Sequence, residues 1–195
     1  MKIEQKYLPP NTLRRPSIKL LGVKFIVAHD TGNDGSTALQ NVNYYINSAR
    51  EMEASAHAFV DDKGVIECIP LDEKAYHVRR VVTKDNEVYG ADSIDYSLGI
   101  ELCFSTKGVF DSKLAYNNYV EYIRGLCTKY NLDPQKHVIA HATLDPTRRS
   151  DPINAFNTFG KTWEQFIKDL VPEVVPIKAP VATPDKNATI KQGIS

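Results

Sequence analysis

Long apolar runs and shorter runs of alternating polarity divide residues 1–170 into expected strands and helices. The run 22–29, GVKFIVAH, is rich in β-branched residues and almost wholly apolar, which is typical of a buried strand. The runs 97–104 and 137–141 are also largely apolar and are expected to be strands. Residues 56–70 contain two strand-like runs on either side of a polar turn, which predicts a β-hairpin.

Three segments carry apolar residues at helical spacing. The segment 113–130 has the clearest apolar stripe and predicts a long helix. The segment 36–50 predicts a second helix that is capped by Ser36, and the segment 163–170 predicts a third. Because helices cover the faces of a sheet when they alternate with strands, we expect an α/β domain with a central mixed β-sheet flanked by helices.

Three other segments lack a regular pattern. Residues 1–20 are interrupted by prolines and predict an irregular arm, and residues 79–95 predict a polar loop. After residue 170 prolines recur at four-residue intervals and aromatic residues are absent, so that segment cannot pack a core. We therefore expect one folded domain over residues 1–170, and a proline-rich linker or tail over residues 171–195 that leads to a further module outside this chain.

The overall composition excludes several classes of function. The chain has 24 Lys and Arg residues against 24 Asp and Glu residues, so electrostatics favours neither nucleic acid nor an anionic membrane as a partner. The three cysteines stand far apart in apolar stretches, which favours buried free thiols. The N-terminus lacks the apolar core of a signal peptide, and no run is long enough to span a bilayer. We therefore expect synthesis in the cytoplasm and no membrane insertion.

Polar residues stand at the ends of the expected strands. His29 ends the first strand, Glu101 lies late in the second, and His141 ends the third, with Asp151 in the loop that follows. Strand ends are rigid, and the loops beside them can shape a pocket. Two imidazoles and one carboxylate leave a fourth position open on zinc, which is the arrangement of a catalytic site. In such a site Glu101 would be the general base, and Arg149 would donate hydrogen bonds to the developing oxyanion.

Each of these residues also has a simpler interpretation. A single histidine at a strand end is usually hydrogen-bonded without a metal. The pair Asp151-Pro152 is typical of an ordinary turn, and Glu101 could pair with an arginine across the sheet. Arg148 and Arg149 could simply be solvated. The spacing of these residues does not by itself decide between a metal site and these alternatives.

A more specific pattern appears in four segments, read in order. They are VAHDTG ending at Gly32, SAHAFVDDKGVIECIPLDEKAYH at 55–77, SLGIELCF at 97–104 and HATLDPTRRSDP at 141–152. In these segments the chain resembles the zinc-dependent N-acetylmuramoyl-L-alanine amidases of the type 2 family. That family shares its fold with the peptidoglycan recognition proteins and with many bacteriophage endolysins. The resemblance covers about residues 23–170, and it implies the type 2 amidase fold and a Zn²⁺ cofactor.

The resemblance implies a role for five residues in the metal centre. His29, His141 and Asp151 fall on the zinc ligands of the family, and Glu101 falls on its catalytic glutamate. Arg149 stands where many members have a lysine that stabilises the tetrahedral intermediate. Arginine keeps the positive charge of that lysine, but its planar, forked head has a different shape.

Three further residues are implied to bind substrate. His57 matches a histidine near the metal of the family. Tyr76 and His77 stand where members commonly have Trp-His followed by Ala-Gly, beside the groove for glycan and peptide. In this chain Val78 and Arg79 replace the two small residues, so the groove is expected to have a different shape.

The implied reaction is hydrolysis of the amide bond between N-acetylmuramic acid and the L-alanine of the peptidoglycan stem peptide. Together with the lack of a signal peptide and the proline-rich tail, it leads us to expect a monomeric phage or prophage endolysin, or a related autolysin, that acts on the bacterial cell wall after release. Two alternatives stay open. One is a peptidoglycan recognition domain without catalysis, and the other is a glycosidase that uses Glu101 and Asp151 as a carboxylate pair.

Overall fold

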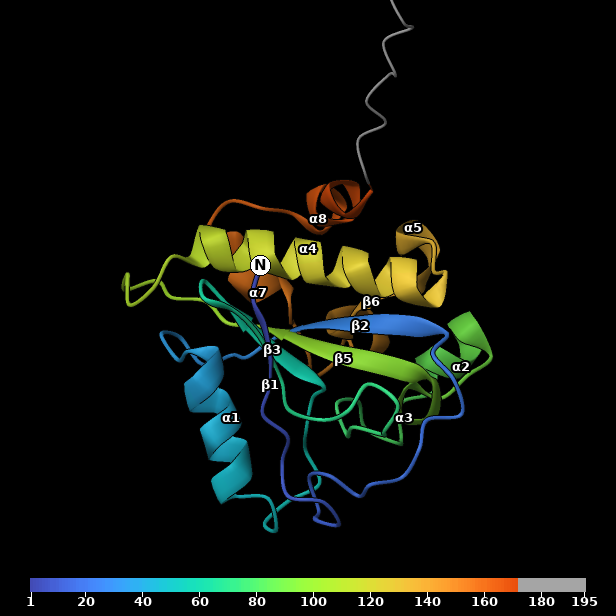
Figure 1. Cartoon of the computed structure of the whole chain (residues 1–195). Helices are drawn as coiled ribbons and strands as arrows, with labels where there is room; N and C mark the ends of the chain where they lie inside the picture. The colour runs from blue at the N-terminus through green and yellow to red at the C-terminus, as the bar shows by residue number, and fades with distance from the viewer. Residues whose placement is uncertain (172–195) are drawn as a thin grey trace, which may run out of the picture.

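A six-stranded sheet lies at the centre of the computed structural model, which describes residues 1–171 (Figure 1). Its strands are β1 (Ile3–Gln5), β2 (Phe25–Asp30), β3 (Ala58–Asp61), β4 (Gly64–Glu67), β5 (Ser97–Leu102) and β6 (Val138–Ala140). The strand order is β1-β4-β3-β5-β2-β6. The hairpin β3-β4 is antiparallel, and the other neighbouring strands run parallel. The prediction of an α/β domain with a central mixed sheet is therefore confirmed.

β2 lies between two parallel neighbours, β5 and β6. All six of its residues are buried, which explains its almost continuous apolar sequence. Because the three strands are parallel, their carboxyl ends meet at one edge of the sheet. The register places His29 of β2 directly beside Glu101 of β5 at that edge. Two polar residues that stand far apart in the sequence thus become neighbours.

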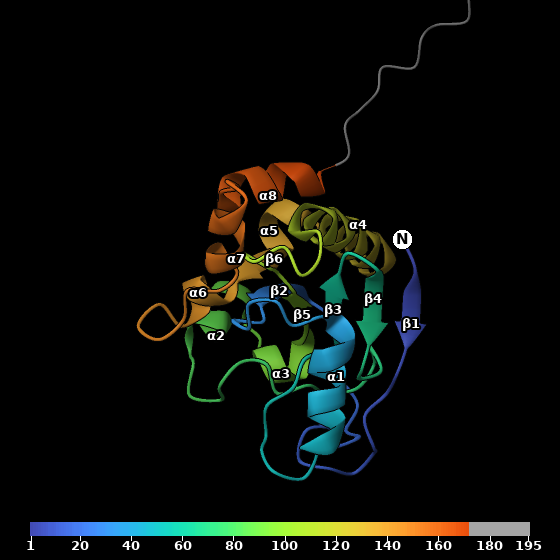
Figure 2. The same cartoon turned by 90° about the vertical axis from the view of Figure 1, so that its left-hand side faces the viewer.

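Eight helices surround the sheet within the described residues. They are α1 (Ala38–Asn47), α2 (Lys84–Tyr89), α3 (Ser93–Tyr96), α4 (Ser112–Tyr130), α5 (Pro134–His137), α6 (His141–Leu144), α7 (Ile153–Thr158) and α8 (Trp163–Leu170). The long helix α4 covers one face of the sheet together with α7 and α8, and α1 packs beside β3 and β4 on the other side (Figures 1 and 2). The prediction that helices flank the sheet on both faces is confirmed.

The three predicted helices form close to the expected residues. α4 begins after Asp111, whose carboxylate accepts the backbone N–H groups of residues 113 and 114. α8 spans 163–170 as predicted. The predicted cap of the first helix is wrong by one residue, because Thr37 caps α1 in a capping box with Gln40. Ser36 instead donates its backbone N–H to the carbonyl of Asn33 in the preceding turn.

Two predictions about irregular segments are wrong. The N-terminal arm contains β1, because residues 3–5 pair with β4. The sequence of the arm does not reveal this pairing. The polar loop 79–95 contains α2 and α3. These two helices are joined by the buried carboxylate of Asp85, which accepts hydrogen bonds from the backbone and hydroxyl of Ser93. The short helix α7 was not predicted, and the strand expected at 137–141 is limited to β6.

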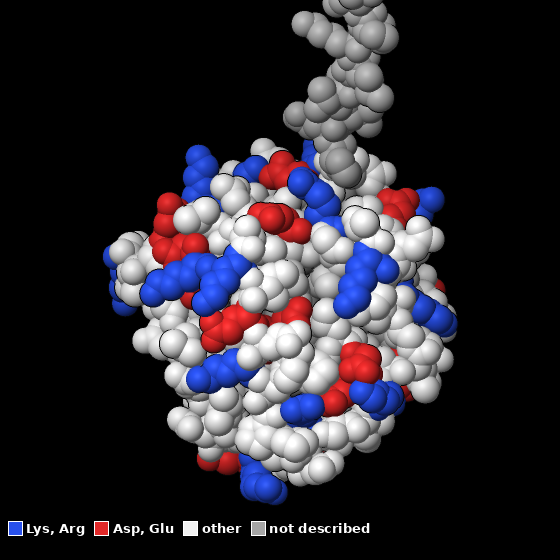
Figure 3. Space-filling model, in the orientation of Figure 1, with Lys and Arg blue, Asp and Glu red and all other residues white. Residues whose placement is uncertain are grey.

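The surface agrees with the balanced charge of the chain. Acidic and basic side chains alternate over the face shown in Figure 3, without a large area of one sign. No helix within residues 1–171 is long and apolar enough to cross a membrane. All three cysteines are buried free thiols, as predicted. The predicted tail covers residues 171–195, and all of it except residue 171 lies outside the described part of the chain.

Candidate metal centre

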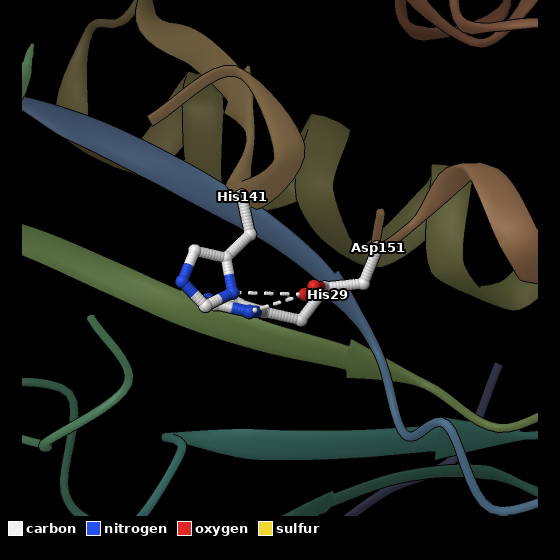
Figure 4. A group of neighbouring side chains, drawn as sticks. All are labelled: His29, His141 and Asp151. Carbon is white, nitrogen blue, oxygen red and sulfur yellow. Dashed lines mark hydrogen bonds and ion pairs between the residues drawn. The ribbon is translucent and has the colours of Figure 1, made fainter. Parts of the chain in front are cut away.

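Three predicted ligands converge at the carboxyl ends of β2 and β6 (Figure 4). One carboxylate oxygen, Asp151 Oδ2, lies 2.9 Å from His29 Nδ1 and 3.0 Å from His141 Nδ1. One potential ligand atom from each of the three residues lies within 4.8 Å of the other two. The two imidazole side chains are only 3% and 4% exposed, and the carboxylate is 13% exposed. The donors therefore form a compact and mostly buried cluster.

The loop after β6 returns Asp151 to the strand end. The backbone N–H of Ala142 donates to the carbonyl of Asp151 at 2.9 Å, which closes residues 142–151 into a loop. Within the loop, the carboxylate of Asp145 holds the guanidinium of Arg148 at 3.1 Å. His141 and Asp151 are ten residues apart in the sequence, but they are in contact because a hydrogen bond joins the two ends of the loop.

The electrostatics of the cluster favour metal ligation. Burial and, to a smaller extent, the nearby His141 lower the pKa of His29 to about 4 against the opposing effect of Asp151. For Asp151, burial raises the pKa, but the two imidazoles of His141 and His29 beside its carboxylate outweigh this effect and hold the pKa below the usual range. At neutral pH His29 is therefore neutral and Asp151 is ionised. These are the protonation states in which imidazole and carboxylate bind a metal.

Glu101 faces this cluster from the neighbouring strand. Its Oε2 atom is buried and has no hydrogen-bond partner within residues 1–171. Burial raises the pKa of Glu101 well above the usual value, the charges of Asp151 and Asp30 raise it further, and Arg149 opposes them. A carboxyl group with a raised pKa beside a metal site is suited to accept a proton and then release it.

The residues present fit a zinc ion. Two neutral imidazoles and one carboxylate are the donor set of an open catalytic zinc site. Besides Glu101 Oε2, the buried His141 Nε2 atom has no partner within the described residues. Buried polar atoms are normally hydrogen-bonded, so unpartnered ones beside a cavity mark a place where another group binds.

The cluster opens into a cavity of about 320 Å³. Arg149 lines it from the exposed loop 146–150, together with the buried residues at the ends of the strands. A second hollow of about 320 Å³ adjoins the cavity, since Tyr76, His77 and Arg149 line both. The second hollow is also lined by two further arginines, Arg79 and Arg80. Val78 and Arg79 stand where two small residues were expected, and both line this second hollow next to the metal cluster.

The structure places the three predicted substrate-binding residues differently. Tyr76 and His77 line the cavity, but His57 does not. The His57 ring is buried, with Nε2 donating to the carbonyl of Glu73 at 2.9 Å and Nδ1 accepting the N–H of Gly99 at 3.0 Å. Both nitrogens are thus used within the protein. His57 thus joins β5 to the segment after β4, and its expected contact with substrate stays a prediction.

Sequence reasoning missed the part that Tyr119 plays. Tyr119 lies on the apolar face of α4, and its hydroxyl reaches the backbone of the metal-binding strand. It accepts the N–H of His29 at 3.1 Å and donates to the carbonyl of His29 or of Ile100, at 3.1 and 3.0 Å. The side chain is fully buried, so the hydroxyl needs these partners. In the sequence this tyrosine is indistinguishable from the other aromatic residues of the stripe.

Arg14 was also missed, because it lies in the segment predicted as an irregular arm. It is 1% exposed and donates to Ser48 at the end of α1 and to the carbonyl of Ala54. Its guanidinium stacks over the ring of Tyr45, 4.2 Å from the ring centroid. Tyr45 and Ala54 both line the cavity. The N-terminal arm therefore holds one wall of the cavity in place.

Comparison with known sequences connects this site to a family. A family model described as N-acetylmuramoyl-L-alanine amidase matches residues 19–154. The chain is similar to the N-acetylmuramoyl-L-alanine amidase BlyA of Bacillus subtilis (strain 168), with 34% identity over 154 residues. The alignment covers 75% of this chain and 41% of BlyA, so the chain spans about two fifths of the length of this relative.

Comparison with solved structures gives a consistent result. The structure is similar to that of PlyL, with 27% identity and a TM-score of 0.66, over 87% of this chain and 97% of the PlyL chain. It is also similar in fold to the catalytic domain of XlyA, with 24% identity and a TM-score of 0.71, over 88% of this chain and all of that domain. In both comparisons the similarity in fold extends over nearly the whole of the other chain.

Proposed function

The chain belongs to the N-acetylmuramoyl-L-alanine amidase family, and we propose that it hydrolyses the amide bond between N-acetylmuramic acid and L-alanine in peptidoglycan. The observation that carries the proposal is the convergence of His29, His141 and Asp151 beside the unpartnered carboxyl group of Glu101. His29 and Glu101 lie on neighbouring parallel strands, His141 begins α6 directly after β6, and Asp151 follows in a loop; all four residues line one cavity.

We propose that Zn²⁺ is the metal held by His29, His141 and Asp151. A buried, charge-neutralising set of two imidazoles and one carboxylate leaves a coordination position for a water molecule or substrate. Zinc bound in this way would lower the pKa of water to about 7 and polarise a carbonyl oxygen. The remaining chemistry falls to side chains of the protein.

Glu101 is the proposed general base and acid. Its carboxylate takes a proton from the attacking water as the water oxygen bonds to the amide carbonyl carbon. It then passes that proton to the amide nitrogen, so that the C–N bond breaks and L-alanine leaves with a free amino group. The raised pKa of Glu101 makes it a stronger base once it is ionised, and its freedom from other hydrogen bonds keeps the carboxylate available.

Arg149 is the proposed donor to the oxyanion that forms at the attacked carbonyl. It lines the cavity from the exposed loop 146–150, and its charge is close enough to influence the pKa of Glu101. The five N–H donors of its guanidinium give it more than one orientation in which to donate, whereas a lysine would act as a point charge. A preorganised donor of this kind stabilises the transition state more than the substrate.

Tyr76 and the arginines beside it are the proposed contacts for the stem peptide. Tyr76 lines both hollows and lies under the guanidinium of Arg80, which is 5.3 Å from the ring centroid. This wall adjoins the cavity that contains the proposed metal ligands. For His57, the two bonds within the protein support a bracing role in place of the substrate contact expected from the sequence.

For the whole protein we propose a role as a phage or prophage endolysin or a related autolysin, acting as a monomer on the bacterial cell wall. The similarity to BlyA and to PlyL supports this class, although the chain spans two fifths of BlyA. We keep the proposal that residues 1–170 are the catalytic domain and that residues 171–195 link it to a wall-binding module.

Digestion of defined muropeptides tests the proposed function. The purified chain is incubated with muropeptides as prepared, after treatment with a chelator, and after re-addition of Zn²⁺, and the products are identified by mass. We expect free lactyl carboxylate on muramic acid and new amino-terminal L-alanine, with cleavage lost on chelation and restored by zinc.

Two other results would overturn the proposal in different ways. New reducing ends that form equally well with and without chelator would identify a glycosidase that uses Glu101 and Asp151 as its carboxylate pair. Tight binding of muropeptides without any cleavage, by protein that has been loaded with zinc, would identify a recognition domain.

A further inference from the structure

We propose that His77 is a positioning residue for the metal site, which accepts the Nε2 proton of His29 and so directs the His29 Nδ1 lone pair at the metal. The inference rests on the proposed zinc site and adds a function for a residue that was expected only to touch substrate. It is carried by a chain of hydrogen bonds through Ser93, Ser97, His77 and His29.

His77 is bonded at both of its ring nitrogens. Its Nδ1 lies 3.1 Å from Nε2 of His29, and its Nε2 lies 3.2 Å from the hydroxyl oxygen of Ser97. The residue is buried although it forms part of the cavity wall. A neutral imidazole has one donor and one acceptor nitrogen. With both engaged, His77 has no ring nitrogen left for a hydrogen bond to substrate.

The direction of the chain is set at its far end. The hydroxyl oxygen of Ser97 lies 2.6 Å from the carbonyl oxygen of Ser93, one helical turn earlier. Two oxygens this close require a hydrogen between them, and the carbonyl has none, so the hydroxyl of Ser97 donates to it. The oxygen of Ser97 can then only accept, and His77 Nε2 must carry the proton that it accepts.

The remaining protons follow from this first one. Because Nε2 of His77 is protonated, Nδ1 of the same neutral ring is an acceptor, and it receives the proton on Nε2 of His29. His29 Nδ1 is therefore unprotonated, and its lone pair faces Asp151 Oδ2 at 2.9 Å. Two lone pairs directed at each other at this distance repel, unless a cation lies between them. The hydrogen-bond chain thus prepares His29 as a ligand through Nδ1.

The backbone of β5 is shaped to receive His77. A Cβ atom added to Gly99 would lie 2.6 Å from Nδ1 of His77 and 2.7 Å from its Cβ, so any side chain at this position would displace the ring. Gly99 is held in turn by His57, whose Nδ1 accepts its N–H. The absence of a side chain at position 99 therefore brings the His77 ring against the strand, within reach of both Ser97 and His29.

The second histidine ligand has no such support. Nε2 of His141 is buried without a partner within residues 1–171, whereas Nε2 of His29 is bonded to His77. A hydrogen bond at the far nitrogen fixes the ring orientation and raises the basicity of a metal-binding histidine. We therefore assign this effect to His29 alone, which leaves His141 Nε2 free to bond a group that enters the cavity.

The test is the Zn²⁺ affinity of the whole chain and of four variants, one of them a control, measured by competition with a chromophoric chelator. His77→Ala removes the acceptor, and we expect Zn²⁺ to bind about 10- to 100-fold more weakly than to the unmodified chain. His77→Asn places an amide oxygen near the position of Nδ1, and we expect it to restore most of the lost affinity. Ser97→Ala releases the far end of the chain, and we expect a smaller loss, on the order of a few-fold.

A second measurement reports on the proton itself. In the zinc-loaded chain, nitrogen-edited NMR should show a His29 Nε2 proton that exchanges slowly with solvent, and the same proton should exchange rapidly in His77→Ala. His137→Ala is the control, because His137 lies at the end of α5 and bonds to Asp133, away from this chain of hydrogen bonds. It should match the unmodified chain in both measurements.

The outcomes separate this inference from the proposed function. Equal Zn²⁺ affinity and equal proton exchange in the unmodified chain and in His77→Ala would overturn the role of His77 and leave the zinc amidase in place. An unmodified chain that binds no Zn²⁺ would overturn the proposed function as well. If His77→Ala fails to fold, which circular dichroism reveals, Ser97→Ala and His77→Asn decide: affinities in the opposite order to that expected would overturn the inference.

Discussion

The two sides of the cavity hold their functional residues in different ways. On the sheet side, His29 and His77 are buried and bonded to each other, and Glu101 projects from the adjacent strand. On the loop side, residues 146–150 are all exposed, and Arg149 has no ion pair within the described residues. The sheet side fixes the atoms that a metal needs at set distances, whereas the loop side can adapt to a substrate.

This difference has an electrostatic consequence. Burial lowers the pKa of His29 and raises the pKa of Glu101, so the sheet side is held in protonation states that favour metal binding and proton transfer. The same burial works against stability in the metal-free chain, because charged forms of these groups are poorly solvated.

Removing the proposed base on the sheet side should have the largest effect. Glu101→Gln keeps the shape of the side chain but cannot take a proton, and we expect kcat for muropeptide cleavage to fall by about 10²- to 10⁴-fold. Glu101→Ala should lose activity in the same way and still bind Zn²⁺. Near-normal turnover in either variant would show that another group is the base.

Glu101→Gln should lower activity but raise the stability of the metal-free chain. Because the pKa of Glu101 is raised in the folded chain, its ionised form opposes folding at pH values above the usual carboxyl pKa. Metal-free Glu101→Gln should therefore unfold at a higher denaturant concentration than the unmodified chain at pH 7. A lower midpoint would mean that Glu101 is stabilised by a partner in the folded state.

Removing the loop-side donor should have a smaller and different effect. For Arg149→Ala we expect kcat to fall by up to about 100-fold, with a smaller change in KM, because the guanidinium acts on the transition state. Arg149→Lys should recover part of the loss. Zn²⁺ affinity and stability should stay unchanged in both variants, since Arg149 is exposed. A change confined to KM would make Arg149 a residue that binds the ground state of the substrate.

The pH dependence of stability should come from the sheet side. Burial chiefly lowers the pKa of His29 and of His57 to about 4, below the value near 6.5 in the unfolded chain. The unfolded state therefore takes up protons first, and stability is lost as the pH falls from about 6.5 to about 4, by at most about 1.4 kcal/mol per pH unit for each histidine. Asp151 adds a loss only at lower pH, because its pKa is depressed.

Glu101 works in the opposite direction over part of this range, because the folded chain takes up its proton first. Denaturant unfolding of the metal-free chain between pH 7 and pH 4.5 should therefore show a steeper loss of stability in Glu101→Gln than in the unmodified chain. Parallel curves for the two proteins would contradict the raised pKa of Glu101.

The smallest expected effect tests the support behind the sheet side. Tyr119→Phe leaves the buried N–H of His29 without its partner, and we expect a loss of about 1–3 kcal/mol in the free energy of unfolding and weaker Zn²⁺ binding. Tyr116→Phe is a matched control on the same helix, because its hydroxyl donates to Asp169 instead. It should lose stability without a change in Zn²⁺ affinity. Equal Zn²⁺ affinity in both variants would remove Tyr119 from the metal site.

Long segments with a strong pattern could be predicted from the sequence. The strand β2 and the helix α4 bury a continuous run or stripe of apolar residues, so their own composition determines what they form. β1 could not be predicted, because its three exposed residues become a strand only through hydrogen bonds to β4. The same holds for α2 and α3, whose joining hydrogen bonds come from the buried Asp85.

The residue types available for a metal site can be taken from the sequence, and the order of its motifs indicates the family. How these residues meet depends on the fold, because the parallel register sets Glu101 beside His29 and the closed loop brings Asp151 back to His141. The fold also moved His57 away from the cavity and joined His77 to His29. This is because a histidine's role depends on the partners of its two ring nitrogens, and those partners come from segments that lie far away in the sequence.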